Sequence, residues 1–556
     1  MTVAELLRAR ADDDRPGLRC ADDGRSWTWR EVVAECEDRA LRLAARARPD
    51  RPAHVGVLLD NVPEMVFLLG GAALSGAVLV ALNPTRSAAE LAGDAGRADC
   101  DLIVTQARHA DLAAAVAAAA THAPLPVLPI ENASYRADPP PPPTAAAPPG
   151  PPDDGTLLML IFTSGTSGRP RAVRVTHRKV TVPGENLAGR LLGPGDAVYC
   201  PMPLFHSGAV MAAYAPALAA GAELVLRSRF SASGLLPDVR AHGCTYLHYV
   251  GKALSYALAT PETPADRDNP LRVAFGNEAA PREQRAFAER FGCAVVDAYG
   301  STETAISLSP DPAGPPGSLG RLAEGVKVLD PETGRECPPA RLDASGRLLN
   351  GEEAIGELVN TRGLGLFDGY YNEDAPDRLR DGMFWSGDHA YADANGHVYF
   401  AGRSADRIRV DGENFGAAQV ERVLADLPGA RRLAVYGVPD AASGDQVMLA
   451  LVLDTAAGPF DPEAFAAYLR GRADLGPKWP PRYVRVAPEL PATASNKILK
   501  RSLVRDGWGT GDPVWWRPGR DLGYRPMTPD DKARLRAEFE RRGRLHLLHD
   551  LLEGSG

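Results

Sequence analysis

Two kinds of segment alternate along most of the chain. Short runs of apolar and β-branched residues are separated by longer segments in which apolar residues recur at helical spacing. The short runs read HVGVLLD, AVLVAL, CDLIVT, LLMLIFTSG, ELVLRS, LRVAFG and AVVDAYG. Because buried strands joined by helices form layered, mainly parallel sheets, this pattern predicts an α/β fold.

The longest uncharged stretch, Met65–Leu82, has the length of a membrane span but not its pattern. Gly70, Gly71 and Gly76 interrupt it. A helix from about Pro63, followed by a buried strand, accounts for the stretch better. We therefore expect no stable membrane span.

The second half of the chain has shorter strand patterns and more frequent turns. Amphipathic helices are expected at residues 417–427 and 462–472. Thr528, followed by acidic residues, predicts the N-cap of a last helix. We predict a large N-terminal domain of layered α/β sheets at residues 1–402 and a small, mobile α+β C-terminal domain at residues 403–556.

The composition is that of a globular protein and excludes a disordered or fibrous chain, since 45% of the 556 residues are hydrophobic and 24% are charged. The net charge of −9 offers no attraction to polyanions, so we expect no nucleic-acid partner. The first residues, MTVAELLRARADDD, lack the pattern of a secretory signal, and we expect a cytoplasmic protein. Homodimer formation stays open.

Cysteine and lysine usage narrows the chemistry further. The seven cysteines are widely spaced, and no CxxC or cysteine–histidine cluster has the spacing of a zinc site. Only seven of the 62 basic residues are lysines. Arginine therefore serves wherever a positive charge alone is needed, and each lysine is a candidate for a specific role.

The segment LIFTSGTSGRPRAVRVTH, Leu160–His177, is the most informative in the chain. A buried-type strand runs directly into a loop of serine, threonine and glycine that ends in arginines. Glycines let the backbone turn tightly around an anion, and the hydroxyl and N–H groups supply donors to phosphate oxygens. Arg171 would add a fixed positive charge. A surface turn of the same composition is the plainer alternative, and a GxxxxGK[ST] motif is absent.

Together with later segments, this loop resembles the phosphate-binding motif of the adenylate-forming superfamily, which includes acyl-CoA synthetases, adenylation domains and luciferases. The resemblance covers about residues 20–530. Relatives usually have lysine where this chain has Arg171, an exchange we interpret as tolerated in a lysine-poor chain, although a guanidinium is bulkier and forked. The resemblance implies that ATP is bound by Thr163, Ser164, Gly165, Thr166, Ser167, Gly168 and Arg171.

The following segments match the superfamily in order. PLFHSGA carries His206, which lies in such enzymes where substrate and nucleotide meet. DAYGSTET would stack Tyr299 on the adenine base, bring Thr302 to the α-phosphate and let Glu303 hold Mg²⁺. With GNEAAP, it implies further ATP contacts from Gly276, Asn277, Glu278, Gly300 and Ser301.

The segment Trp385–Phe415 resembles the interdomain signature of the superfamily. It places Asp388 at the ribose hydroxyls of ATP, Arg403 at ribose or phosphate, and Ala405 at the hinge, where many relatives carry a charged residue. PATASNKILKRSLV presents Lys497, which the resemblance assigns to bridging the substrate carboxylate and the α-phosphate. A compact ammonium suits that role better than a guanidinium.

Four further segments carry a closer resemblance: TYLHYVGKAL, LRVAFGNEAAP, Gly412–Asn414 and the ending LVRDGW…DPVWW…YRPMT. Through them the chain resembles the very-long-chain and fatty-acid-transport type of acyl-CoA synthetase within the superfamily. Those relatives usually have glycine at the position of Glu278. A carboxylate there would narrow or polarise the pocket wall, so we expect a small or aromatic acid rather than a long aliphatic one. The implied substrate pocket consists of His206, Val250, Gly276, Glu278 and Ser301.

The resemblance implies an enzyme that uses ATP and Mg²⁺, with Lys497, Thr302, Glu303 and His206 as catalytic residues. We favour a ligase that activates a small-molecule carboxylic acid as acyl-AMP and transfers it to coenzyme A. The alternative is an ATP-dependent diazotase, which activates nitrite and couples it to an arylamine. A nucleotide-binding protein without activity is a third hypothesis, which the retained site residues disfavour.

Overall fold

The computed structural model divides, by its internal contacts, into two compact units. One comprises Met1–Ser307 and Arg362–Phe384, and the other comprises Leu308–Thr361 and Trp385–Gly556. Each is described by itself, and the predicted boundary at residue 403 stays a prediction. The structure describes residues 1–119, 125–136, 151–164, 170–250, 253–279, 281–309, 311, 314–315, 317–343, 348–403, 407–410, 413–441, 444–454, 458–472, 475–476, 478–492, 498–519, 521–542, 544–545 and 547–548.

The first unit contains a seven-stranded sheet that is parallel except at one edge. Its strand order is β13-β12-β11-β9-β10-β1-β2, and only the edge strand β2 runs antiparallel to its neighbour. The strands are β1 (Pro16–Cys20), β2 (Ser26–Thr28), β9 (Ala197–Cys200), β10 (Glu223–Leu226), β11 (Tyr246–Val250), β12 (Val273–Asn277) and β13 (Ala294–Asp297).

A six-stranded sheet of order β6-β5-β3-β4-β7-β8 is the second layer of this unit. It is parallel except for β8, which forms an antiparallel pair with β7. The strands are β3 (His54–Leu58), β4 (Val78–Ala81), β5 (Leu102–Thr105), β6 (Val127–Pro129), β7 (Leu157–Ser164) and β8 (Pro170–Thr176).

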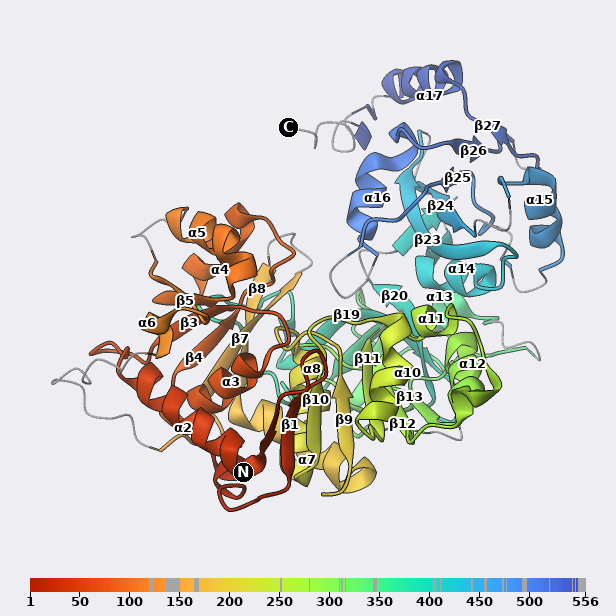
Figure 1. Cartoon of the computed structure of the whole chain (residues 1–556). Coiled ribbons are helices and arrows are strands. Elements are labelled where there is room, and N and C mark those ends of the chain that lie inside the picture. The colour runs from red at the N-terminus through yellow and green to blue at the C-terminus, as the bar shows by residue number, and fades with distance from the viewer. Residues whose placement is uncertain are drawn as a thin grey trace. The chain divides into compact units, whose positions relative to one another are not determined.

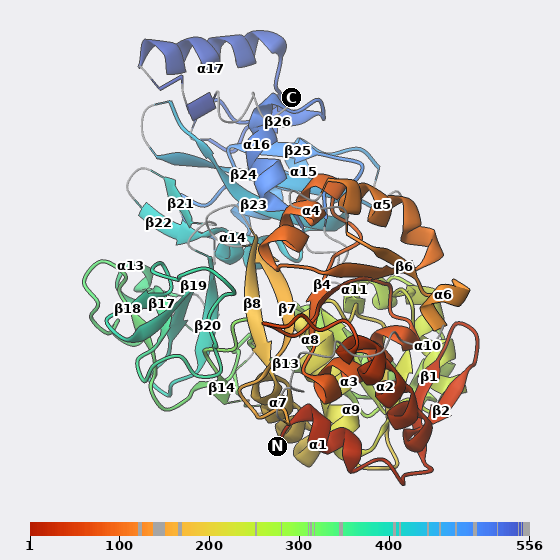
Figure 2. The same ribbon diagram turned by 90° about the vertical axis from the view of Figure 1, so that its left-hand side faces the viewer.

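Helices cover the faces of these sheets (Figure 1). Val55, Val57 and Leu79 on one face of the six-stranded sheet belong to the largest apolar core, together with residues of α2 and α3. On the other face, Val78 and Val80 share a separate core with α4 and α5, and Figure 2 shows the sheet between these helix pairs. The helices are α1 (Val3–Arg8), α2 (Trp29–Ala44), α3 (Pro63–Ser75), α4 (Ala88–Arg97), α5 (Ala110–Ala118), α6 (Ala133–Arg136), α7 (His177–Leu191), α8 (Ser207–Ala209), α9 (Ala215–Ala220), α10 (Ala232–Ala241), α11 (Ala253–Leu258) and α12 (Pro281–Phe291).

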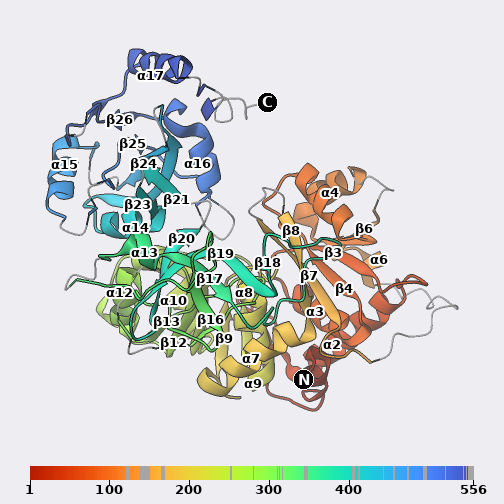
Figure 3. The ribbon, with the colours of Figure 1, turned by 180° about the vertical axis from the view of Figure 1, so that it is seen from behind.

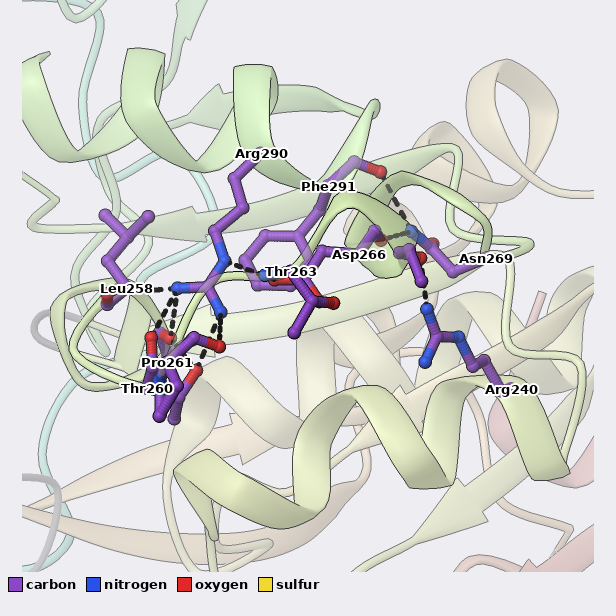
Figure 4. Close-up of polar contacts among 11 residues, drawn as sticks. Arg240, Leu258, Thr260, Pro261, Thr263, Asp266, Asn269, Arg290 and Phe291 are labelled. Carbon is purple, nitrogen blue, oxygen red and sulfur yellow. Dashed lines mark hydrogen bonds and ion pairs between the residues drawn. The ribbon is translucent and has the colours of Figure 1, made fainter.

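A buried arginine ties the outer helices of the seven-stranded sheet together (Figure 4). Arg290 on α12 donates to Asp266 Oδ2 at 2.7 Å, in a short helical turn at Pro264–Arg267. Its remaining nitrogens donate to the carbonyls of Ala257, Leu258, Thr260 and Pro261 and to Thr260 Oγ1. The guanidinium therefore fixes the connection between α11 and α12 by bonds to the main chain.

The second unit has smaller sheets. Two of them are antiparallel two-stranded sheets, β14-β15 and β21-β22, and β16-β17-β19 is extended by β20, which pairs with β19. β18 (Leu379–Arg380) pairs with the first two residues of β19, and both parts of this pair belong to the first unit. The strands of this unit are β14 (Leu308–Ser309), β15 (Arg321–Leu322), β16 (Val326–Leu329), β17 (Gly356–Asn360), β19 (Met383–Ala392, of which the first two residues belong to the first unit), β20 (Val398–Arg403), β21 (Arg407–Val410) and β22 (Glu413–Gly416).

A five-stranded sheet of order β23-β24-β25-β26-β27 forms the last part of this unit. Its two faces carry separate cores, one shared with α16 and α17 and the other with α14 and α15. Figure 3 shows α15 and α16 on opposite sides of the sheet. The elements are β23 (Ala430–Pro439), β24 (Asp445–Leu453), β25 (Tyr483–Val486), β26 (Val514–Trp516), β27 (Arg525–Pro526), α13 (Gly351–Ala354), α14 (Ala417–Leu424), α15 (Pro462–Arg470), α16 (Lys500–Asp506) and α17 (Pro529–Arg541).

The predicted fold class is confirmed: layered α/β sheets are followed by a smaller α+β part. The uncharged stretch is helix α3 and strand β4, as predicted, and Gly76 ends the helix with φ at +77°. Thr528 caps α17 by accepting from the Asp531 N–H group. No helix among the described residues is long and apolar enough to cross a bilayer.

Candidate active site

The predicted phosphate loop is the segment of the chain that connects β7 and β8. The two strands pair up to the loop itself, with Thr163 opposite Arg171 and Ser164 opposite Pro170. The side chain of Ser164 and the residues Gly165, Thr166, Ser167 and Gly168 lie outside the described part of the chain. The sheet therefore fixes the two stems of the loop, while phosphate binding stays a prediction.

Arg171, at the end of the loop, is 4% exposed and contacts both Asp377 and Tyr370. Its two terminal nitrogens donate to the two carboxylate oxygens of Asp377 at 2.7 and 2.6 Å. Its guanidinium lies over the ring of Tyr370, 4.0 Å from the ring centroid. Burial, the largest single effect, lowers the pKa of Arg171, but the hydrogen bonds to Asp377 and the neighbouring charges together hold that pKa above its ordinary value. The sequence singled out neither Asp377 nor Tyr370.

Glu303, the predicted metal ligand, is 8% exposed. Its Oε1 accepts a hydrogen bond of 3.0 Å from the Tyr370 hydroxyl. Burial and then the charge of Glu303 raise the pKa of Tyr370, so the hydroxyl is a donor at neutral pH. Lys179 on α7 is also buried; burial lowers its pKa to about 8, and the charges of Glu303 and Asp368 oppose that shift.

The segments that carry His206 and Thr302 meet through a pair of hydroxyls. Ser207 Oγ lies 3.0 Å from Thr302 Oγ1. His206 is the N-cap residue of the short helix α8, and a π-helical turn at Val210–Tyr214 follows. Such turns are frequent at functional sites. The structure thus joins two predicted site segments that are far apart in sequence.

The carboxyl ends of β11, β12 and β13 gather the predicted pocket residues. Val250 pairs with Asn277, and Gly276 pairs with Asp297. The carboxyl ends of parallel strands are where open α/β sheets bind ligands. The side-chain oxygen of Asn277 is buried and has no hydrogen-bond partner within the described structure, as expected of a group that meets a bound donor.

The structure gives a reason for glycine at position 276 that the sequence alone did not reveal. A Cβ atom there would lie 2.1 Å from the carbonyl oxygen of Tyr249 on the neighbouring strand. The Tyr249 hydroxyl donates to Asp297 Oδ2 at 2.9 Å, and the same oxygen accepts from the Ala279 N–H at 2.9 Å. Burial raises the pKa of Asp297 to about 6. Together these contacts hold the loop in which Glu278 adopts a φ of +65°.

The loop after β13 contains the remaining predicted nucleotide contacts. Tyr299 and Ser301 are half-buried, and Gly300 is exposed. A Cβ atom on Gly300 would meet no other atom within 4 Å. The adenine contacts of these residues stay predictions.

In the second unit, the residues predicted at the ribose are strand neighbours. Asp388 on β19 is buried and pairs in register with Arg403 on β20. The Asp388 N–H donates to Ser386 Oγ at 3.0 Å. The side chain of Arg403, together with Ala405 and Lys497, lies outside the described residues.

Comparison with known proteins identifies relatives along nearly the whole chain. Residues 7–371 match the family model "AMP-binding enzyme", and residues 419–497 match "AMP-binding enzyme C-terminal domain". The chain is 47% identical to the steroid-22-oyl-CoA synthetase of Rhodococcus jostii, with 99% of each chain covered. It is 45% identical to the medium/long-chain-fatty-acid–CoA ligase FadD17 of Mycobacterium marinum, over 94% of this chain and 99% of that protein.

The solved structures include an ATP-bound MatB from Rhodopseudomonas palustris. It superposes with a TM-score of 0.77 at 24% identity and covers 91% of this chain and 98% of its own. At that identity the likeness concerns the fold. It agrees with the layered sheets described above.

Proposed function

The chain belongs to the AMP-binding enzyme family, and from that membership we propose that it is an ATP-dependent ligase that activates a carboxylic acid as acyl-AMP and transfers the acyl group to coenzyme A. The observation that carries this proposal is the similarity, over nearly the whole length, to proteins named as CoA synthetases or ligases. The same names give the diazotase hypothesis no support.

In this reaction a carboxylate oxygen attacks the α-phosphorus of ATP, and pyrophosphate leaves. The sulfur of coenzyme A then attacks the acyl carbonyl, and AMP leaves. Both steps develop negative charge on oxygen, so the protein contributes mainly position and hydrogen-bond donors. The hydroxyl of Thr302, held beside Ser207, is our candidate donor to the α-phosphate.

Glu303 fits a magnesium ion that enters with ATP. Magnesium prefers oxygen ligands and commonly binds through one or two carboxylates together with substrate phosphates. No cluster of three or more His, Cys, Asp or Glu side chains that could hold a metal ion is found among the described residues. When bound, the ion neutralises phosphate charge. Glu303 contributes the carboxylate oxygens that Tyr370 leaves available.

For the acid we propose an apolar molecule of medium to large size, because the relatives are named for steroid-22-oyl and medium- or long-chain fatty acids. This differs from the small or aromatic acid expected from Glu278. The side chain of Glu278 is exposed, and its positive φ is a conformation that a non-glycine residue adopts at a cost. A carboxylate in that place favours an acid with a polar group beyond its apolar body.

The test is a pyrophosphate-release screen over fatty acids, steroid side-chain acids and aryl acids, each with and without coenzyme A. We expect release with apolar acids and a thioester product only when coenzyme A is present. Nitrite with an arylamine is the comparison arm. Turnover of that pair without a thiol, and of no carboxylic acid, would contradict the proposal.

Lys497 gives a second test, which separates the two half-reactions. Because its ammonium is proposed to bridge the carboxylate and the α-phosphate, Lys497→Ala should slow adenylation by about a hundred- to a thousandfold, the scale of one lost transition-state donor. Thioester formation from supplied acyl-AMP should be largely spared. Lys500→Ala is the matched control, since Lys500 pairs with Glu421 at 3.0 Å. Equal losses in both half-reactions would exclude the role.

A further inference from the structure

The basic residue at the end of the phosphate loop is held by protein groups on several sides. Both terminal nitrogens of Arg171 are bound by Asp377, and its Nε lies 3.8 Å from a carboxylate oxygen of Glu373. Bidentate pairing of this kind fixes the plane of a guanidinium. A side chain held in this way is a fixed support, unlike the flexible ammonium that relatives usually carry at this position.

Arg171 covers the ring of Tyr370, and the backbone of Tyr370 lies along the edge of the six-stranded sheet. Tyr370 forms a β-bridge with Val173 on β8, and the next residue, Tyr371, donates its N–H to the carbonyl of Ala172 at 2.8 Å. Phe367 packs edge-on against Tyr370 at 5.0 Å between ring centroids. The ring is thus fixed by its backbone, by an aromatic neighbour and by the guanidinium above it.

The Tyr370 hydroxyl ends this series of contacts at Glu303. It donates to Oε1 at 3.0 Å, and both side chains are buried. A buried carboxylate that accepts one fixed hydrogen bond has its rotamer set and directs its remaining lone pairs one way. Tyr370 therefore contacts both Arg171 and Glu303 and connects the two side chains directly.

We propose that Arg171 is a positioning residue: with Asp377 it fixes Tyr370, and Tyr370 orients the Glu303 carboxylate toward the metal-bound nucleotide. Arg171 therefore acts on Glu303 and is not itself a phosphate ligand. The inference rests on the proposed function, because that function brings MgATP to Glu303. It assigns to Tyr370 and Asp377 roles in the site that neither the sequence nor the comparisons gave.

The primary test is Tyr370→Phe, which removes the hydroxyl and keeps the ring under Arg171. Binding of Mn²⁺ in the presence of a non-hydrolysable ATP analogue is measured by electron paramagnetic resonance, and binding of metal-free ATP by calorimetry. We expect Mn²⁺ affinity to fall about tenfold, the effect of losing a group that orients a metal ligand, with metal-free ATP binding unchanged. Tyr371→Phe is the matched control, because the Tyr371 hydroxyl donates to Asp99 instead.

The second test separates positioning from direct phosphate binding. Arg171→Lys keeps the charge but loses the fork and the stacking. If Arg171 positions Tyr370, this variant weakens Mn²⁺ binding as Tyr370→Phe does, and the double variant is no worse than either, since the two act in one series. If Arg171 binds phosphate, lysine preserves the Mn²⁺ affinity, and the inference is wrong.

The outcomes also distinguish this inference from the proposed function. A wild-type protein that releases pyrophosphate with a carboxylic acid, together with Tyr370→Phe of unchanged Mn²⁺ affinity, overturns the inference alone. A wild-type protein that binds Mn²⁺ with the nucleotide but activates no acid overturns the proposed function and leaves the metal measurements to decide the role of Tyr370. Melting curves of each variant identify loss of fold.

Discussion

Two of the buried arginines of the first unit look alike but have different roles. Arg290 and Arg171 are both buried, and each binds an aspartate. The other hydrogen-bond partners of Arg290 are carbonyls and a hydroxyl at the end of α11 and in its connection to α12 (Figure 4). Arg171 lies instead over Tyr370, whose hydroxyl reaches Glu303. The lesson is that burial and pairing do not identify a functional arginine; the groups that its partners touch do.

The largest expected effect is a loss of stability when Arg290, the structural arginine of the two, is replaced. Arg290→Met removes the donors to Asp266 and to the carbonyls between α11 and α12, and it leaves a buried carboxylate unpaired. The free energy of unfolding should fall by about 3–5 kcal/mol, while kcat/KM per folded molecule should not change. Urea unfolding and active-site titration measure the two quantities.

The control for that variant is Arg240→Met. Arg240 is exposed and donates to the carbonyls of Asp268 and Ala265 in the same region. Its loss should cost less than about 1 kcal/mol. If Arg290→Met instead spared stability and lowered kcat/KM, the assignment of Arg290 to structure alone would be wrong.

The aspartates that pair with the two arginines, Asp266 and Asp377, should show the same difference with smaller effects on stability. The Asp266 side chain is 6% exposed and that of Asp377 is 40% exposed. Asp266→Asn should therefore lower the free energy of unfolding by about 2 kcal/mol, as for a buried charged hydrogen bond, and leave the KM for MgATP unchanged. Asp377→Asn should cost less than about 1 kcal/mol in stability and raise that KM. Steady-state kinetics alongside urea unfolding would measure both, and the reverse assignment of effects would contradict the account.

The smallest expected effect is a change in how steeply the stability of the protein falls at acidic pH. Hydrogen bonds from Thr263 and Arg290 lower the pKa of Asp266. Burial, the largest single effect, raises the pKa of Asp377, but the hydrogen bonds from Arg171 and the nearby positive charges together lower it below its ordinary value. A lowered pKa in the folded state gives stability that is present above the unfolded-state value near 3.8 and is lost as pH falls through the folded-state value. Below about pH 4 the melting temperature of the wild type should fall more steeply than that of Asp266→Asn. Equal slopes would contradict this assignment.

Sequence reasoning predicted the features that local chemistry determines. The helix beginning at Pro63 and the capped helix after Thr528 follow from residues within one turn of each end. The strand that leads into the loop, at residues 157–164, was likewise predicted from its own run of apolar residues, whereas the strand at residues 170–176 was not predicted. These elements require no knowledge of distant partners.

Contacts between distant segments were beyond that reasoning. Arg171 and Asp377 are 206 positions apart, and nothing near Asp377 marks it as a partner. Gly276 was predicted for its approach to a nucleotide, whereas the structure shows the Tyr249 carbonyl occupying the space of a side chain. The available signal was the group of acidic residues that includes Glu373 and Asp377 and follows Tyr370, whose backbone bridges to β8.

The central claim, that the protein forms an acyl adenylate, is tested most directly by following the carboxylate oxygen. An apolar acid labelled with heavy oxygen in its carboxylate is incubated with ATP, Mg²⁺, coenzyme A and the full-length enzyme, and the AMP product is analysed by mass spectrometry. Because the attacking oxygen stays on the α-phosphorus when the thiol displaces AMP, we predict one labelled oxygen in AMP and an acyl-CoA thioester. Thioester formation with unlabelled AMP, or with ADP and phosphate as products, would contradict the account.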